Sequence, residues 1–272
     1  MLNGILEPYL SGVDDAEALS YALKIVINIV YGLTSAKFEN PFRDPRNIDN
    51  IVAKRGALFM INLKNMVQDL GYPVVHIKTD SIKIPNADKK IIDIVMEYGE
   101  QFGYEFEHES TYEKFCLVND AVYIAKTADG KVPSYWEAVG AQFQHPYVFK
   151  TLFSKEPLEF RDMCETKTVS TALYLDFNGE DTAMAFEDPM HFVGKAGSFC
   201  PIKEGKGGGL LMREKDGKFY AAVGTKGYRW LEAEMVEALD KADDIDKRYF
   251  EGLVNDAVDN ISKYGDFEWF AS

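Results

Sequence analysis

The residues best suited to chemistry in this chain begin with Lys24, Asn28 and Tyr31, which are followed by Gly32. In a helix these three side chains stand at i, i+4 and i+7 and share one face. A basic side chain fixed on a rigid helix can neutralise the charge of a bound triphosphate. Asp80 comes later, in a short Thr-Asp-Ser turn, where a carboxylate can hold a divalent cation. The spacing predicts a nucleotide-handling helix followed by a hairpin that carries a metal-binding carboxylate.

Each of these features also has a purely structural interpretation. The helix would then be a core helix with an incidental polar stripe. Asp80 would make a local Asx-type hydrogen bond inside its turn, which is common. A further alternative is an unrelated metal-dependent nucleotide enzyme, for which Lys24 and Asp80 would face different surfaces.

Two helices must position the first group of residues. The hydrophobic period predicts a helix over 16–35 and a second helix over 48–70. Asn47 or Asp49 is expected to cap the second helix, and Gly71 to stop it. The apolar face of the first helix consists of Leu19, Leu23, Val26, Ile27 and Val30.

The carboxylate is expected on a β-hairpin. Strands are predicted at 74–77 and 81–84, with Lys78, Thr79 and Asp80 in the turn between them. A third helix follows over 87–102, and then two strands near 104–109 and 115–126.

The second half of the chain is less regular. A turn is expected at Asp129-Gly130, and 134–165 is predicted to be helical in part. Glycine-bearing turns divide 169–224 into the short segments of a small antiparallel sheet. A final helix is predicted from one apolar stripe, which consists of Ile245, Tyr249, Phe250, Leu253, Val254, Ala257, Val258 and Ile261.

The segment Lys24 to Gly32 resembles motif B of B-family DNA polymerases, which reads K-x-x-x-N-S-x-Y-G. Lys24, Asn28, Tyr31 and Gly32 match, while Ile29 stands where the family usually has Ser. The resemblance implies that Lys24 and Asn28 face the incoming triphosphate. It also implies that Tyr31 lies beneath the nascent base pair, where it resists ribonucleotides.

The turn around Asp80 resembles motif C of the same family, Y-G-D-T-D-S. Thr79, Asp80 and Ser81 match its last three positions, and Lys78 replaces its first Asp. The resemblance makes Asp80 a catalytic ligand of Mg²⁺ in two-metal phosphoryl transfer. A Lys at position 78 competes with a cation for the carboxylate, so the metal geometry departs from the family pattern.

Other residues are candidates for contact with a primer–template duplex. Tyr123 falls where the family carries its K-K-R-Y element, and Lys126 is a possible phosphate contact beside it. In the C-terminal region Lys206 lies beside three glycines, while Lys226 and Arg229 stand among aromatic residues. A flexible loop and a strand-to-helix junction are the structural alternatives there.

Motif A of the family, D-x-x-S-L-Y-P-S, which supplies the other metal-binding Asp, has no match before Lys24. The chain therefore resembles the C-terminal portion of a phage-type polymerase, without motif A and the exonuclease. The implied fold is α+β, with fingers-derived helices over 1–72, a palm-like antiparallel sheet over 73–160 and a thumb-like α+β region over 161–272. The implied activity is dNTP addition to a primer 3′ end, weak or absent without the missing N-terminal half. A non-catalytic DNA-binding or replisome-interaction remnant is the alternative.

Charge and composition set the remaining bounds. The net charge is −14, but Lys and Arg outnumber acids over 24–64, and acids dominate 231–272. A polyanion would meet the first region and avoid the last. No apolar run is long enough to cross a membrane, and the N-terminus lacks a signal-peptide pattern. A cytoplasmic location is therefore expected. If a phage encodes the chain, this would be the cytoplasm of the infected host cell.

The other chemistry-bearing residues form no motif. The cysteines lack paired spacing and predict free thiols in a reducing compartment; these are Cys116, Cys164 and Cys200. The four histidines form no zinc pattern, and the Gly-Lys-Gly-Gly-Gly run is not a P-loop.

Overall fold

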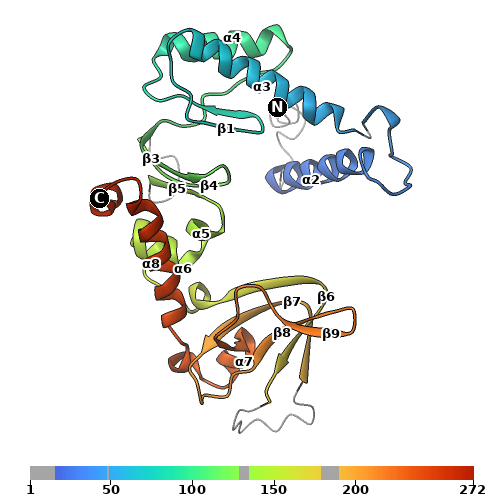
Figure 1. Cartoon of the computed structure of the whole chain (residues 1–272), viewed down its shortest axis with the longest axis vertical. Coiled ribbons are helices and arrows are strands. Elements are labelled where there is room, and N and C mark those ends of the chain that lie inside the picture. The colour runs from blue at the N-terminus through green and yellow to red at the C-terminus, as the bar shows by residue number, and fades with distance from the viewer. Residues whose placement is uncertain (1–15, 48, 129–134, 179–189) are drawn as a thin grey trace. The chain divides into compact units, whose positions relative to one another are not determined.

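A computed structural model describes residues 16–47, 49–128, 135–178 and 190–272 of the chain (Figure 1). The chain divides into two compact units, Met1–Glu109 and Ser110–Ser272, which are taken separately below. Helices and purely antiparallel strands both contribute, so the predicted α+β class is confirmed. The division at 109–110 falls inside the segment predicted as palm, and the assignment of fingers, palm and thumb stays a prediction.

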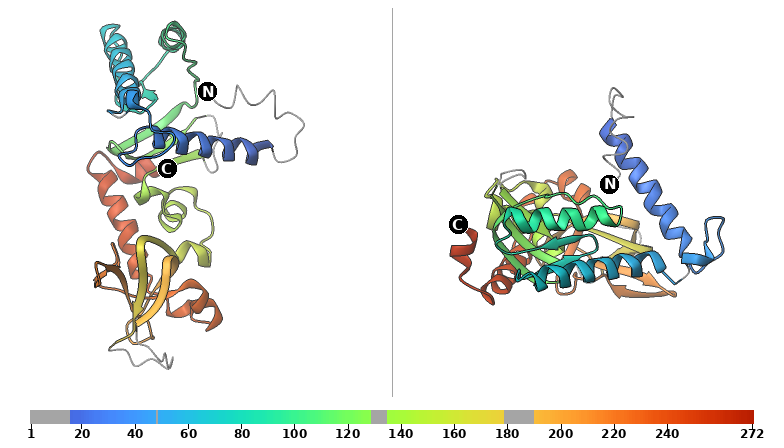
Figure 2. Two further views of the ribbon diagram at one scale, coloured as in Figure 1. Left: turned by 90° about the vertical axis from the view of Figure 1, so that its right-hand side faces the viewer. Right: turned by 90° about the horizontal axis from the view of Figure 1, so that it is seen from above.

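The first unit opens with helix α2, Ala16–Thr34, which confirms the helix predicted over 16–35. Figure 2 shows it as one unbroken helix, in dark blue. A loop with one 3₁₀ turn, η1 at Pro45–Asn47, leads to α3, Ile51–Asp69. Gly71, at φ +90°, follows the end of α3, as predicted.

The predicted cap of α3 needs correction. The residue at the N-cap position is Asn50, in the left-handed region and without a side-chain cap. Asn47 instead lies three residues earlier, where its Oδ1 accepts a hydrogen bond from the Val52 N–H at 3.4 Å. The left-handed backbone at Asn50 turns the chain into the helix, and this displaces the capping side chain upstream.

Helices α3 and α4, Lys89–Gln101, run side by side and enclose a small core (Figure 2). Asp88 caps α4 by accepting a hydrogen bond from the Ile91 N–H at 3.0 Å. The hairpin of β1, His76–Lys78, and β2, Ser81–Lys83, packs its isoleucines against this core. The core residues are Met60, Leu63, Val67, Ile91 and Val95.

The strand predicted near 104–109 is wrong, because no strand forms there. Tyr104 and Phe106 turn back onto the helices instead: their ring centroids lie 4.9 and 6.0 Å from that of Phe59. Gly99 permits this approach, since a Cβ there would sit 2.6 Å from the Phe106 ring. The aromatic pattern predicted a strand, but packing on the helix surface decides the conformation.

The second unit begins with a three-stranded sheet of order β3-β4-β5. The predicted single strand 115–126 is instead a hairpin of β3, Tyr112–Asn119, and β4, Val122–Thr127. The chain turns because the Asn119 Oδ1 accepts a hydrogen bond from the Ala121 N–H at 2.9 Å. The predicted Asp129-Gly130 turn lies outside the described residues. The third strand is β5, Trp136–Val139.

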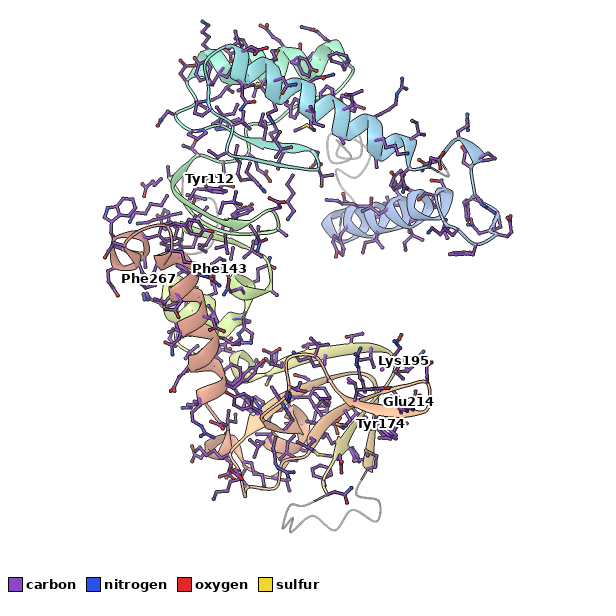
Figure 3. All side chains as sticks on the ribbon, in the orientation of Figure 1. Tyr112, Phe143, Tyr174, Lys195, Glu214 and Phe267 are labelled. Carbon is purple, nitrogen blue, oxygen red and sulfur yellow. The ribbon has the colours of Figure 1, made fainter. Side chains whose placement is uncertain are left out.

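Short helices follow, as predicted for 134–165, and cover this sheet. They are α5 at Ala141–Gln144, α6 at Pro146–Phe149, a π-helical turn η3 at Lys150–Ser154 and a 3₁₀ turn η4 at Phe160–Met163. Their apolar residues and those of the C-terminal helices α8, Arg248–Ser262, and α9, Phe267–Ala271, form one core. Phe143, labelled in Figure 3, is buried in this core, and Phe267, also labelled, packs against it.

The predicted small antiparallel sheet forms, with five strands in the order β10-β7-β6-β8-β9. It starts earlier than predicted, because β6 spans Glu165–Asp176, and it ends later, with β10 at Arg229–Glu232. The other strands are β7 at Met190–Ile202, β8 at Leu210–Lys215 and β9 at Lys218–Ala221. Asp216 and Gly217, both at positive φ, make the predicted turn between β8 and β9.

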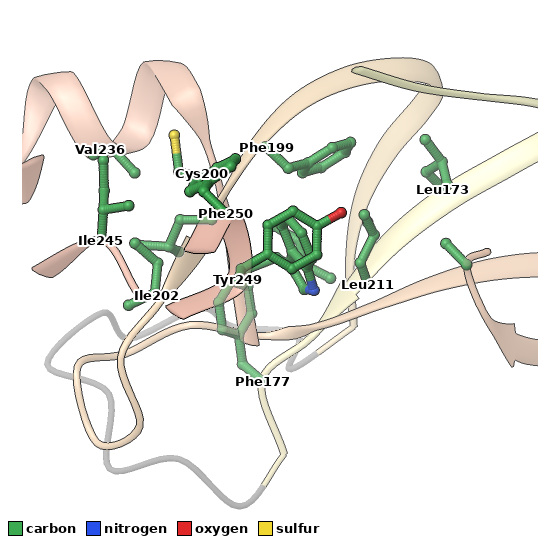
Figure 4. Close-up of a cluster of buried hydrophobic side chains, with 14 of the residues drawn as sticks. Leu173, Phe177, Phe199, Cys200, Ile202, Leu211, Val236, Ile245, Tyr249 and Phe250 are labelled. Atoms are coloured by element: carbon green, nitrogen blue, oxygen red, sulfur yellow. The ribbon is translucent and has the colours of Figure 1, made fainter. Parts of the chain in front are cut away.

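A second core of this unit lies between the five-stranded sheet and the helical segments α7, Ala233–Ala238, η5, Ala242–Asp244, and α8. Figure 4 shows Phe199, Leu211, Tyr249 and Phe250 meeting there. The apolar stripe predicted for the final helix is confirmed. It serves both cores, because Leu253 and Val254 pack against each of them.

Candidate nucleotide and metal site

Lys24, Asn28 and Tyr31 lie on α2 with exposed side chains. Because α2 is regular over its full length, the i, i+4, i+7 spacing puts them on one face, about 10 Å from first to last along the axis. Gly32 follows on the same helix, and a Cβ there would meet nothing within 4 Å. The predicted polar face therefore exists as a continuous and accessible surface.

The apolar residues of α2 are also exposed, which the sequence did not predict. Tyr21 is 66% exposed, Val26 54% and Ile29 56%. A helix buried in this unit would hide such side chains, since burying each one fully is worth about 1.5–3 kcal/mol. The interpretation of α2 as a core helix with an incidental polar stripe is therefore wrong for this unit.

Asp80 stands at the tip of the β1–β2 hairpin, as predicted. The prediction that Lys78 lies in the turn is wrong, because Lys78 ends β1 and pairs with Ser81 across the strands. Thr79 and Asp80 alone form the turn, with Thr79 at φ 53°. Both turn residues are exposed. Within the described ranges the Asp80 carboxylate takes part in no hydrogen bond or ion pair, so the local Asx-type bond does not form.

The donor set around Asp80 is small. In the part of the chain that the structure describes, no three His, Cys, Asp or Glu side chains gather as a metal site. Mg²⁺ is usually held by one or two carboxylates together with phosphate oxygens and waters. The exposed carboxylate of Asp80 is one ligand of the kind that such a site uses.

Lys24 and Asp80 both belong to the first unit, and both are exposed. No ion pair joins them among the residues that the structure describes. Their convergence on one nucleotide stays a prediction.

Tyr123 is placed differently from the prediction of a duplex contact. Its side chain is only 5% exposed, and its hydroxyl donates a hydrogen bond to the Glu137 Oε1 at 2.5 Å. Tyr112 donates to the other oxygen of Glu137 at 2.7 Å. Tyr123 is thus part of a buried hydrogen-bonded group, and its position argues against direct contact with a nucleic acid.

Lys126 is half-buried on β4. Its Nζ donates to the Ser272 carbonyl oxygen at 3.0 Å and lies 3.9 Å from the Glu113 carboxylate. Its charge is already partnered, which weakens it as a phosphate contact.

The two C-terminal basic segments meet in space. Gly209 and Trp230 exchange two backbone hydrogen bonds, of 2.7 and 2.8 Å. The Arg229 guanidinium donates to the Gly208 carbonyl oxygen at 3.2 Å. The loop that carries Lys206 and the segment that carries Lys226 and Arg229 were predicted as separate duplex contacts. The two segments are joined through Gly208, Gly209 and Trp230.

The positive charges on and near these two segments are partly neutralised. The Lys206 Nζ lies 3.6 Å from the Asp244 carboxylate, and Arg248 forms a bidentate pair with Asp246. Lys226 is exposed and forms no ion pair within the described part of the chain. It is the cation of this group most available to a phosphate.

The second unit also holds an ionic cluster that no sequence pattern predicts. The Glu165 carboxylate lies 3.0 Å from the His145 Nε2 and 3.1 Å from the Lys167 Nζ, and it accepts a hydrogen bond from the Tyr249 hydroxyl at 3.0 Å. Burial opposes the ionisation of Glu165, but His145 and Lys167 outweigh it and lower the pKa to about 2. Glu165 and Lys167 are two residues apart on β6, but His145 and Tyr249 are distant in sequence, so no spacing signals the whole cluster.

No protein-family model matches this chain, and no curated protein matches it. No helix in the described ranges is long and apolar enough to cross a membrane.

Proposed function

We propose that this chain is the C-terminal portion, from motif B onward, of a B-family DNA polymerase of the phage type. Its role is to help add dNTPs to the 3′ end of a primer by two-metal phosphoryl transfer. The partners are a primer–template duplex, dNTP and a separate N-terminal polymerase half that carries motif A.

One observation carries this proposal: Lys24, Asn28 and Tyr31 form an accessible polar face on a regular helix, and Asp80 is an unpaired carboxylate at a hairpin tip. Lys24 would neutralise triphosphate charge and Asn28 would donate a hydrogen bond to a phosphate oxygen. Tyr31, two turns along, would contact the base pair and sugar. These roles require exposure, and each residue has it.

Asp80 would hold one Mg²⁺, which when bound stabilises the charge on the transferring phosphoryl group. Two-metal chemistry needs a further carboxylate, and motif A, which supplies it in the family, has no match before Lys24. We therefore expect the chain to be inactive, or nearly so, on its own.

The exposed apolar side of α2 supports a missing half. Three of its apolar side chains are exposed to water: Leu19, Val26 and Ile29. A partner protein that buried them would gain the hydrophobic free energy of that contact. A polymerase half that carries motif A would have to approach this helix, because motif A and motif B act on the same nucleotide.

Nucleotide binding tests the assignment of α2. The full chain is titrated with a fluorescent dATP analogue in the presence of Mg²⁺. We expect Lys24→Ala to weaken binding about tenfold, the equivalent of about 1.4 kcal/mol. Lys90→Ala removes an exposed lysine from α4 and is the matched control, with no expected change. Equal affinities for the two variants, or no binding by the wild-type chain, would contradict the proposal.

Primer extension tests the missing half. A labelled primer–template is incubated with the chain, dNTPs and Mg²⁺, with and without a protein from a neighbouring reading frame that encodes D-x-x-S-L-Y-P-S. Extension is expected only in the mixture, and Asp80→Ala should abolish it. Extension by the chain alone, lost in Asp80→Ala, would overturn the argument from a single carboxylate.

A non-catalytic DNA-binding or replisome-interaction remnant is the second candidate, and Lys78 favours it. Its ammonium stands two residues from Asp80, where the family has an acid, and it repels a cation. Such a remnant would bind the duplex without Mg²⁺-dependent dNTP binding.

A further inference from the structure

Two of the three cysteines face each other across neighbouring strands. The register of β6 and β7 pairs Glu165 with Phe199, so Cys164, one residue before β6, stands opposite Cys200. Their Sγ atoms are 3.4 Å apart. Directly opposed residues of antiparallel strands have Cα atoms about 4.5–5.5 Å apart, which lies within the range that disulfides span.

The two thiols differ in exposure. Cys200 is fully buried, in the core of the five-stranded sheet (Figure 4). Cys164 is partly exposed and lines a surface hollow of about 460 Å³, together with Phe160, Arg161, Ser198 and Glu237. A small reagent in this hollow meets Cys164 and not Cys200.

The two thiols also differ in acidity. A hydrogen bond with Cys200 lowers the pKa of Cys164, and a further one with Ser198 adds to this effect, although burial opposes both. The same partnership, together with burial, raises the pKa of Cys200. The exposed thiol is thus the one that more readily becomes a thiolate, which is the nucleophilic form.

His145 lines the same hollow, but it is not placed to act as a base for Cys164. Its Nδ1 accepts a hydrogen bond from the Tyr147 N–H at 3.2 Å, and its Nε2 lies 3.0 Å from the Glu165 carboxylate. Because Nδ1 is hydrogen-bonded to Tyr147 and Nε2 is buried against Glu165, neither ring nitrogen is a partner of Cys164, and the arrangement is not that of a cysteine hydrolase. The remaining chemistry open to Cys164 is with the second sulfur.

We propose that Cys164 and Cys200 form a redox-active dithiol that a low-molecular-weight disulfide converts into an intramolecular disulfide. Cys164 is the attacking residue and Cys200 the resolving residue. This property is independent of the proposed polymerase function.

The exchange balances without any other reagent. The Cys164 thiol loses its proton, and the thiolate attacks one sulfur of the small disulfide, breaking that S–S bond and forming a mixed disulfide. Cys200 then loses its proton and attacks the Cys164 sulfur, displacing the second small thiolate. The protein dithiol is oxidised by two electrons, the small disulfide is reduced to two thiols, and these take up the two protons.

Cys116 provides an internal control. It is 6% exposed, on β3 in the other core of the unit, and burial raises its pKa. It has no sulfur partner, since the only close sulfur pair among the described residues is Cys164 with Cys200. It should neither react with the oxidant nor cross-link.

The test treats the native full chain with excess glutathione disulfide, blocks remaining thiols with iodoacetamide and analyses the products by intact and peptide mass spectrometry. We expect the loss of two hydrogens and a peptide pair joined through Cys164 and Cys200. Cys116→Ala should give the same cross-link. Cys164→Ala should leave Cys200 unmodified, and Cys200→Ala should stop at a mixed disulfide on Cys164.

Two outcomes would overturn the proposal. One is a wild-type chain that stays fully reduced or stops at the mixed disulfide. The other is modification of Cys116 as fast as that of Cys164 under native conditions. If Cys200→Ala fails to fold, binding of phenylarsine oxide to the wild-type chain decides the matter, because a trivalent arsenical needs both thiols. Retention of that binding in Cys116→Ala and its loss in Cys164→Ser support the dithiol, and any other pattern contradicts it.

Discussion

The Nδ2 amide of Asn47 donates a hydrogen bond to the Thr34 Oγ1 at 2.7 Å, and this bond ties the start of α3 to the end of α2. Asn47 is 5% exposed, and its Oδ1 also accepts a bond from the Val52 N–H. This buried amide thus helps to join the helix that carries Lys24 to the start of α3.

Replacing Asn47 with Ala should loosen this connection. The loss of two side-chain hydrogen bonds, with partners left unsatisfied, costs about 1–3 kcal/mol. We expect amide hydrogens over 44–47 and 49–54 to exchange about tenfold faster or more in native-state exchange experiments. Asn62→Ala removes an exposed Asn from the middle of α3 and should leave this segment unchanged. Equal protection in the two variants would show that the bond does not restrain the loop.

The Glu165 cluster predicts a dependence of stability on pH. The pKa of Glu165 is about 2 in the folded state and near its ordinary value of 4.5 in the unfolded chain. Its contribution is therefore fully present above pH 4.5 and is lost as pH falls towards 2. Glu165→Gln should lower the free energy of unfolding by about 2–3 kcal/mol at pH 7, and by little near pH 2.

Urea denaturation of both proteins at a series of pH values measures this difference. Glu234→Gln replaces an exposed acid on α7 and serves as the control. A difference between Glu165→Gln and wild type that stays constant from pH 7 to pH 2 would contradict the assigned pKa.

Gly208 should tolerate no side chain. A Cβ there would lie 2.9 Å from the Arg229 Cβ and 3.1 Å from the Trp230 backbone nitrogen. Gly208→Ala would push β10 away from the loop and should cost about 1–3 kcal/mol, as overpacking does. Gly252→Ala, on α8 with nothing within 4 Å of the added Cβ, should instead be neutral or stabilising by up to about 1 kcal/mol. Thermal denaturation of the two variants tests the contrast.

Tyr123 should act on stability rather than on DNA binding. Tyr123→Phe removes the hydroxyl that donates to Glu137 and should lower stability by about 1.5–3 kcal/mol, because the acceptor is charged. Tyr264→Phe removes an exposed hydroxyl whose bond to the Val118 carbonyl is 3.3 Å long, and it should cost less. Fluorescence anisotropy with a labelled primer–template should show equal affinity for Tyr123→Phe and wild type. A weakened affinity without a loss of stability would restore the duplex contact that the sequence suggested.

Local patterns predicted the main elements of the fold. The apolar periods of α2, α3, α4 and α8 are strong, and the tight turn at Thr79-Asp80 follows from short β-branched segments on either side. The strand predicted at 104–109 does not form, because its aromatic residues pack back onto helices. Whether α2 is buried could not be deduced, because an amphipathic period predicts an apolar face and not what covers it.

The sequence could not predict sites that depend on contacts between residues distant in the chain. Cys164 and Cys200 are neighbours only through the register of β6 and β7, and Glu165 meets His145 and Tyr249 only in the folded unit. By contrast, the polar face of α2 and the position of Asp80 in its turn depend on local structure alone. Both could therefore be predicted from the sequence.

Helix α8 has a consequence for any attempt to divide the second unit. Tyr249 and Phe250 fill the core under the five-stranded sheet, while Ala257 and Ile261 fill the core beside the three-stranded one. Helix α8 thus contributes buried residues to both cores, and each core is incomplete without it. A fragment that ends before Arg248 would lack the α8 residues of both cores. A fragment that begins at 161, as a separate thumb, would lack the other residues of the core beside the three-stranded sheet. The smallest part of this unit that can fold alone should therefore run from 110 to the end of α9.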